Sequence, residues 1–275
     1  MAGWLATGAV VYGGLVTALY LFQRQLLYHP ATATPDLAAS HVPDMRAVRL
    51  ATDDGLDLLA WYKAPPPGRA LVIMFHGNAG HIGHRGWKAR RYLDAGYGVM
   101  LVSWRGFGGN RGSPSEEGLM RDGRAALAFA IGEGVKPARL VFYGESLGSG
   151  IAVALAAEQG AAGDPVGAVV LEAPYSSIAE VAQHHYFYIP ARHLIRDKFD
   201  SMARIAGIKA PLLVVHGELD RTIPVHFARA LYDRAVEPKE AVWLPAAGHN
   251  DVYDHGAGEA VLAFLARVNG FPRSP

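Results

Sequence analysis

Short, continuously apolar runs alternate with helical patterns along most of this 275-residue chain, and this alternation restricts its possible folds most strongly. A run without polar interruptions is typical of a strand buried on both faces. Such runs occupy residues 70–75, 98–103, 139–143, 168–171, 212–215 and, more briefly, 242–244, and the helical patterns occupy 85–95, 114–131, 146–158, 225–234 and 252–268. Two further strands, 47–52 and 56–62, flank a predicted hairpin turn at Asp53-Asp54-Gly55. The chain is therefore predicted to be an α/β protein, with a mostly parallel, doubly wound sheet and helices on both faces.

The N-terminal segment is a candidate membrane span. Residues 3–22 contain no charged side chain, and twenty apolar residues suffice for a helix to cross about 30 Å of hydrocarbon. Ala31-Thr32-Ala33 resembles a signal-peptide cleavage site, but no basic region precedes the apolar run. A buried amphipathic helix is the third alternative, and it fits poorly because the segment is apolar on every face. Residues 1–28 are thus predicted to form an uncleaved anchor helix, whose removal would leave a soluble, active domain.

The remaining sequence divides into a connector and one domain. Residues 29–46 contain Pro30, Pro35 and Pro43 and are predicted to be extended, and residues 47–275 are predicted to form the main domain. Arg24, on the C-terminal side of the apolar run, favours a cytoplasmic location for that domain. A net charge of +1 gives no indication of a nucleic-acid partner. The absence of cysteine excludes disulfides, thiolate metal sites and a cysteine nucleophile.

The sequence Gly144-Glu145-Ser146-Leu147-Gly148 follows one predicted strand and precedes an alanine-rich helix. In that context the Gly-x-Ser-x-Gly pattern predicts a serine on a sharp strand-to-helix turn, with its hydroxyl exposed above the sheet. Any side chain at the two glycines would collide across such a turn. The alternative is a glycine-rich turn with an idle serine, and the flanking strand and helix argue against it.

Two other chemically active side chains also follow predicted strands. Asp220 comes after the run at 212–215, and His249 comes after the run at 242–244. Because ligands bind beyond the carboxyl ends of strands in open parallel sheets, these side chains are expected to meet Ser146. The predicted roles are Ser146 as nucleophile, His249 as the base that takes its proton, and Asp220 as the group that orients the imidazole.

Charge that develops on a substrate carbonyl needs fixed hydrogen-bond donors. The backbone N–H of Leu147 is the first candidate, and the second is expected in the loop after 70–75, at Asn78 or, as a weaker candidate, at Ala79. Asp251 and Asp254 are the alternatives to Asp220.

Several other polar residues are candidates for a chemical role. His76 and His216 precede glycines at strand ends and are expected to bond neighbouring backbone, and Glu145 is expected to be an orienting neighbour. Arg105 is expected to brace its glycine-rich loop, with anion binding as the alternative. The paired histidines at 81/84 and 184/185 lack His-Glu-x-x-His spacing, so no metal site is predicted.

Two local features complete the expectations. Ser113 is predicted to cap the helix over 114–131, with Pro114 at its first position and Glu116 completing a capping box. Residues 175–210 are predicted to form a short lid that includes Tyr186, Phe187 and Tyr188. Those aromatic side chains either cover the core, or line an acyl pocket or touch the bilayer.

Together these motifs resemble the α/β-hydrolase superfamily, and more closely its small membrane-anchored subfamily, which includes acyl-protein thioesterases of the domain-17 type and the related domain-13 proteins. The matching segments are Leu26-Leu27-Tyr28-His29-Pro30, Phe75-His76-Gly77-Asn78-Ala79-Gly80, Arg105-Gly106-Phe107-Gly108, Gly112-Ser113-Pro114-Ser115-Glu116, Gly144-Glu145-Ser146-Leu147-Gly148, Phe199-Asp200-Ser201, His216-Gly217-Glu218-Leu219-Asp220 and Gly248-His249-Asn250-Asp251.

The resemblance implies an α/β-hydrolase fold and hydrolysis of carboxylic esters or thioesters by Ser146, Asp220 and His249, without a cofactor. The implied partners are a small-molecule or lipid acyl substrate and a membrane bound through residues 3–22, with no nucleic acid. The thioesterase members are anchored through an N-terminal cysteine cluster, which this sequence lacks. Two alternatives remain, an aminopeptidase-type amide hydrolase on the same triad and a non-catalytic membrane scaffold with this fold.

Overall fold

A computed structural model describes residues 2–268 of the chain. Its centre is an eight-stranded sheet with the strand order β10-β9-β8-β7-β4-β6-β3-β2. The strands are β2 Arg46–Ala51, β3 Asp57–Lys63, β4 Leu71–Phe75, β6 Gly98–Val102, β7 Leu140–Glu145, β8 Ala168–Glu172, β9 Leu212–Gly217 and β10 Lys239–Leu244. Among the strands of residues 2–268, only the pairs β2–β3 and β3–β6 are antiparallel, and β2 and β3 form the predicted hairpin. The predicted α/β fold with a mostly parallel eight-stranded sheet is confirmed.

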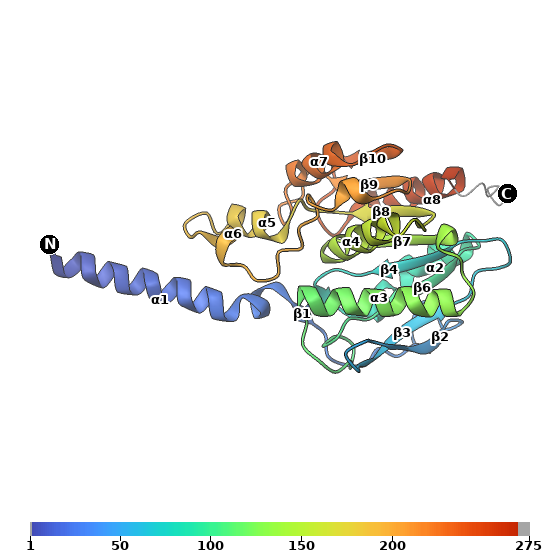
Figure 1. Cartoon of the computed structure of the whole chain (residues 1–275), viewed down its shortest axis with the longest axis horizontal. Helices are drawn as coiled ribbons and strands as arrows, with labels where there is room; N and C mark the ends of the chain where they lie inside the picture. Colours follow the sequence, from blue (N-terminus) through green and yellow to red (C-terminus); the bar gives the residue numbers. More distant parts are fainter. Residues whose placement is uncertain (1, 269–275) are drawn as a thin grey trace.

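Helices cover both faces of this sheet (Figure 1). They are α2 Gly86–Asp94, α3 Glu116–Gly132, α4 Leu147–Ala161, α7 Val225–Arg234 and α8 Ala257–Val268, with short 3-10 turns at η1 Ile82–Arg85, η2 Pro137–Arg139, η3 Ile205–Gly207 and η4 Val252–His255. Alternate residues of β4 enter different cores: Leu71 and Ile73 pack on the side of α3, α4 and α7, and Val72 packs on the side of α2 and α8. Burial on both faces explains why inner strands such as β4 and β6 are continuously apolar.

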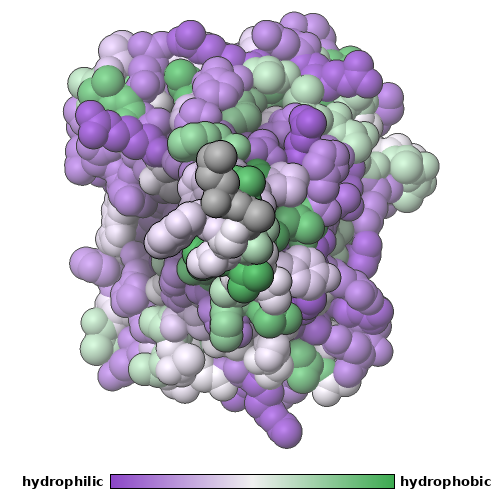
Figure 2. Space-filling model, turned by 90° about the vertical axis from the view of Figure 1, so that its left-hand side faces the viewer, coloured by the Kyte–Doolittle hydropathy of each residue, from purple (hydrophilic) through white to green (hydrophobic). Residues whose placement is uncertain are grey.

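The N-terminal helix α1, Ala2–Leu27, projects away from the sheet as a stalk (Figure 1). Over Gly3–Leu27 it is long and apolar enough to cross a membrane, and its apolar window is not buried in the rest of the chain. Figure 2 looks along this helix from its free end. Hydrophobic side chains gather at the centre of that face around α1, and hydrophilic residues surround them.

The segment after α1 packs against the domain. His29–Pro30 (β1) pairs in parallel with Ala79–Gly80 (β5), which lies in the loop after β4. Further along, Val42 and Met45 are buried in the core that includes α2 and α8. The predicted connector is not extended throughout, because turns are closed by the Ser40 N–H on the Leu37 carbonyl and by the Met45 N–H on the Val42 carbonyl. It contributes side chains to the core of the domain.

The predicted cap of α3 was wrong by two residues. The helix begins at Glu116, and the capping hydroxyl is that of Ser115, which accepts a hydrogen bond from the Gly118 N–H at 3.1 Å. Both serines are good capping residues, but Pro114 lies against Gly106 of the neighbouring loop and stays outside the helix. The carboxylate of Glu116 instead accepts the backbone N–H groups of Lys198 and Phe199.

The lid lies between β8 and β9 and contains the helices α5 Ile178–His185 and α6 Ala191–Leu194. It lies beside the C-terminal half of α1 (Figure 1). The Tyr12 hydroxyl donates to the carbonyl of Tyr188 at 3.0 Å, and Gln23 accepts a hydrogen bond from the Arg196 N–H at 2.6 Å. The helix and the lid therefore form one assembly above the carboxyl edge of the sheet.

Candidate active site

Ser146 lies between the end of β7 and the start of α4, on a sharp turn. Its backbone has φ 49° and ψ −117°, a left-handed conformation that costs a non-glycine residue on the order of 1–3 kcal/mol. The turn is held because the Ser146 N–H donates to the Glu172 carbonyl at 2.8 Å. A Cβ at Gly148 would lie 2.0 Å from the Phe75 carbonyl oxygen, and one at Gly144 would lie 2.5 Å from the Cα of Ser149. The expectation that both glycines avoid collisions across the turn is confirmed.

The structure brings Ser146, Asp220 and His249 together. The Ser146 Oγ lies 3.1 Å from the Nε2 of His249, and the His249 Nδ1 lies 2.6 Å from the Oδ2 of Asp220. Because a carboxylate oxygen only accepts, Nδ1 carries the proton in this pair. The Nε2 of the neutral ring is then free to accept the hydroxyl proton of Ser146, which is what a general base requires.

Asp220 is held as an anion in a buried setting. Its Oδ1 accepts the backbone N–H groups of Thr222 and Ile223, both at 2.8 Å. Burial alone would raise the pKa of this carboxyl, but the hydrogen bonds from His216, His249 and the backbone hold the pKa below its ordinary value. The alternative acid Asp251 instead accepts the Gly248 N–H at 2.6 Å.

His216 contacts the same carboxylate oxygen of Asp220 as His249 does. Its Nε2 lies 2.8 Å from the Ile223 carbonyl oxygen and 3.2 Å from Asp220 Oδ2. Both neighbours are acceptors, so Nε2 carries the proton of this buried ring. A backbone contact was expected for His216, but its contact with Asp220 was not. The spacing of four residues between His216 and Asp220 was the available signal.

His76 bonds neighbouring backbone, as expected. Its Nδ1 donates to the Gly77 carbonyl at 2.8 Å, and its own carbonyl accepts the indole N–H of Trp104 at 3.0 Å. Burial lowers the pKa of its imidazole to about 3.

The two residues expected to supply oxyanion donors line the same pocket as the serine. Leu147 is the first residue of α4, where a backbone N–H has no partner within the helix. Asn78 lines the same pocket as Ser146. Its side-chain amide donates to the Leu27 carbonyl at 2.7 Å, and its own carbonyl accepts the His29 N–H at 2.8 Å. The loop that carries Asn78 is thus fastened to the end of α1, and the role of its N–H stays a prediction.

Glu145 belongs to a buried charge network behind the serine. Its carboxylate bonds to Arg85 at 2.6 Å and to the ammonium of Lys88 at 2.8 Å, and Lys88 also bonds to Glu172 at 2.8 Å. Burial would raise the pKa of Glu145, but the charges of Lys88 and Arg85 hold it well below its ordinary value. Glu145 is therefore ionised and orients its neighbours, as expected. Lys88 was missed, because a charged residue in an amphipathic helix gives no sign of burial.

Arg105 braces its loop through two ion pairs. Its guanidinium bonds to Asp54 at 2.7 Å and to the fully buried Asp122 at 2.7 Å. Because two carboxylates of the chain already pair with Arg105, the structure does not support the alternative that it binds an anionic ligand. Within residues 2–268, no cluster of three or more His, Cys, Asp or Glu side chains is suited to hold a metal ion.

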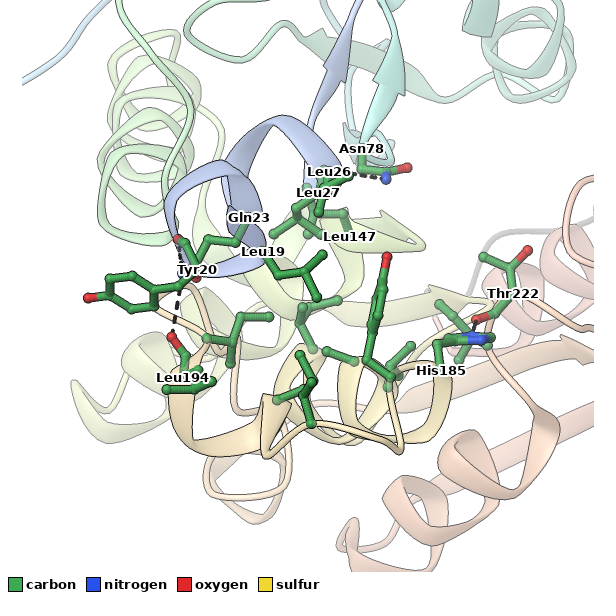
Figure 3. A pocket seen from close by; sticks show the side chains of 18 of the residues that line it. Leu19, Tyr20, Gln23, Leu26, Leu27, Asn78, Leu147, His185, Leu194 and Thr222 are labelled. Carbon is green, nitrogen blue, oxygen red and sulfur yellow. Dashed lines mark hydrogen bonds between the residues drawn. The ribbon is translucent and has the colours of Figure 1, made fainter. Parts of the chain in front are cut away.

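A largely apolar pocket lies between α1 and the lid (Figure 3), and Ser146 is one of the residues that line it. The pocket is lined by Val16, Leu19, Tyr20, Gln23, Leu26 and Leu27 of α1, by Asn78, Ser146 and Leu147, and by Ile178, Val181, Ala182, His185, Tyr186, Ile189, Ala191, Leu194, Ile195, Thr222 and Ile223. The part played by α1 was missed, because a helix that is apolar on every face shows no preferred side. Gln23, the polar residue that ends the apolar run, was the available signal.

Comparisons with known proteins agree with this geometry. The family model described as serine aminopeptidase, S33, matches residues 66–204. The uncharacterized protein Rv2307c of Mycobacterium tuberculosis is 39% identical over 250 residues, which cover 90% of this chain and 87% of that protein. Protein bem46 of Schizosaccharomyces pombe is 30% identical over 266 residues, which cover 90% of this chain and 87% of that protein.

Among solved structures, the esterase Pf2001 of Pyrococcus furiosus aligns with a TM-score of 0.68 at 18% identity, covering 88% of this chain and 97% of that chain. This likeness supports the fold. The family match extends across β4 to β8 and the lid, and so includes the turn that carries Ser146. The chain therefore has the α/β-hydrolase fold and belongs to the serine aminopeptidase S33 family of hydrolases.

Proposed function

We propose that this protein is a membrane-anchored serine hydrolase that cleaves carboxylic esters or thioesters through an acyl-enzyme. The observation that carries the proposal is the hydrogen-bonded series from Ser146 through His249 to the buried Asp220, at one end of an apolar pocket. An intact series of this kind also argues against a non-catalytic scaffold.

The chemistry follows from the proton positions. The Ser146 oxygen attacks the substrate carbonyl while its proton moves to the His249 Nε2, and the ionised Asp220 stabilises the resulting imidazolium. The N–H groups of Leu147 and Asn78 are proposed to bind the negative oxygen of the intermediate. His249 then gives its proton to the departing alcohol or thiol, and a water activated by His249 hydrolyses the acyl-serine. Apart from the substrate and one water, every group in these steps belongs to the chain, so we propose no cofactor.

The character of the pocket favours an acyl substrate over a peptide. An aminopeptidase must hold a free, positively charged amine, which calls for carboxylates near the serine. The pocket residues that the structure describes include no aspartate or glutamate, and most are aliphatic or aromatic. A hydrocarbon chain gains free energy when it leaves water for such a surface.

Residues 1–28 are proposed to anchor the protein, since α1 is long and apolar enough to cross a membrane. The connector 29–46 then joins the anchor to a catalytic domain over 47–275. We propose a cytoplasmic location for that domain, on the basis of Arg24 beside the apolar run.

The test is turnover of a p-nitrophenyl ester by the detergent-solubilised full chain. Ser146→Ala should lower kcat by about 10⁴-fold or more with little effect on the melting temperature. Ser113→Ala, which changes an exposed serine outside the pocket, is the matched control. Equal turnover by wild type and Ser146→Ala would refute the proposal.

A further inference from the structure

The side of α1 that faces the lid has a regular pattern. Val16, Leu19, Gln23 and Leu27 are partly buried, whereas most other residues of the helix are exposed. Their spacings of three and four place them on one face of a helix, and all four line the pocket that contains Ser146. Figure 3 shows Leu19 and Leu27 facing the lid helices across this pocket. One face of the proposed anchor is therefore a wall of the active-site pocket.

The pocket runs along the helix, away from the serine. Asn78, which lines the pocket together with Ser146, bonds to Leu27 at the end of α1. Val16 lies eleven residues before Leu27, which is about 16 Å along a helix. This distance matches a long acyl chain far better than an acetyl group.

The tip of the lid, residues 186–189, lies at a depth that the bilayer would occupy. Tyr12, which bonds to Tyr188, precedes Phe22 by ten residues, or about 15 Å of helix. If residues 3–22 cross a hydrocarbon core of about 30 Å, this contact lies near its middle. Phe187 and Tyr188 have exposed fractions of 79% and 48%, and such aromatic surface is suited to lipid.

Three backbone carbonyls of the lid tip are also suited to this environment. Hydrocarbon offers no hydrogen bonds, so carbonyl groups there need partners within the protein. The Tyr188 carbonyl accepts the Tyr12 hydroxyl, and the Ile189 carbonyl accepts the Gln183 side-chain amide at 2.9 Å. The Tyr186 carbonyl accepts the Ile189 N–H at 3.1 Å.

We infer that the substrate is a membrane-resident lipid with a long acyl chain, which enters from the bilayer between α1 and the lid and lies against Val16, Leu19 and Leu27. This inference rests on the proposed function and narrows its substrate class. The helix that anchors the enzyme then also sets its selectivity for chain length.

The experiment compares two tryptophan substitutions in full-length protein held in phosphatidylcholine nanodiscs. Leu19→Trp fills the pocket. Leu21→Trp is the matched control, because Leu21 is 58% exposed and lies about 200° away around the helix. The measured quantity is the ratio of kcat/KM for p-nitrophenyl palmitate to kcat/KM for p-nitrophenyl acetate.

Leu19→Trp should lower this ratio by about tenfold or more, and Leu21→Trp should change it less than about twofold. Val16→Trp, farther from Ser146, should spare octanoate and reduce palmitate turnover, and this graded result would not arise from misfolding. Equal ratios in all variants, with acetate turnover that still requires Ser146, would overturn the inference and leave the hydrolase proposal standing. Acetate turnover that survives Ser146→Ala would remove both.

Discussion

The guanidinium of Arg24, in the last turn of α1, makes two hydrogen bonds of 2.9 and 3.0 Å to the carboxylate of Asp197 in the lid. The hydroxyl of Tyr28 reaches the same carboxylate at 3.1 Å. Asp197 is buried, with 4% of its surface exposed. The ion pair between Arg24 and Asp197 therefore joins the lid to α1, and its carboxylate is shielded from water.

This pair should contribute measurably to stability. Arg24→Ala leaves a buried carboxylate without its main partner, so the free energy of unfolding should fall by about 1–3 kcal/mol. Arg192→Ala removes an exposed lid arginine and should change it by less than about 0.5 kcal/mol. A double-mutant cycle with Asp197→Asn measures the coupling. If the effects of the two single changes on the free energy of unfolding add, the Arg24 and Asp197 side chains do not stabilise each other.

Removal of the first 28 residues should impair the enzyme, which reverses the expectation drawn from the sequence. The deletion takes away Leu27, which holds Asn78, and the Arg24 and Tyr28 partners of Asp197. A chain lacking residues 2–28 should melt at a lower temperature and lose activity on long-chain esters. A chain lacking only residues 2–11 keeps every one of these contacts and is the control. Equal activity of the two chains on the palmitate ester would show that the contacts of Arg24, Leu27 and Tyr28 are not needed for activity.

His216 should act as a positioning residue for Asp220. His216→Leu removes the N–H that lies 3.2 Å from the Asp220 carboxylate, so we expect kcat to fall by about tenfold with a small change in KM. The pH profile provides a second readout, because a less supported Asp220 stabilises the imidazolium of His249 less well. An unchanged kcat and pH profile would show that His216 serves only packing.

Stability should depend on pH through His76. Its pKa is lowered to about 3 in the folded protein, compared with about 6.5 in an unfolded chain. The unfolded state therefore binds the proton first, and stability should be lost as pH falls from about 6.5 towards 3, by at most about 1.4 kcal/mol per pH unit. Carboxylates with lowered pKa values, such as Asp220, lose their contribution only below about pH 4.

The measurement is urea unfolding of the wild type and His76→Asn between pH 7 and pH 4. The asparagine amide can replace the Nδ1–H donor and does not titrate. Its stability should vary less steeply with pH than that of the wild type. Parallel curves for the two proteins would show that His76 is not the group responsible.

The sheet could be predicted because its signals are local. The inner strands β4 and β6 are continuous apolar runs, and the turn around Ser146 needs two glycines, because a Cβ at Gly148 or Gly144 would lie only 2.0 or 2.5 Å from backbone atoms. The positions of Asp220 and His249 followed from one rule, that parallel strands end at one edge.

The side of α1 that faces the pocket could not be predicted in this way. Val16 and Leu19 are as apolar as Leu21, and only the fold of the lid decides which of them is covered. The burial of Lys88 likewise depends on Glu145 and Glu172, which come from different strands. Contacts of this kind join segments far apart in the chain, and no local pattern encodes them.

Identification of the residue that becomes covalently modified tests the central claim most directly. Full-length protein is treated with a fluorophosphonate, digested and analysed by mass spectrometry. We predict a single phosphonylated residue, Ser146, with labelling that slows by about 100-fold or more in His249→Ala. Modification at another residue, or ester turnover that continues in fully phosphonylated protein, would contradict it.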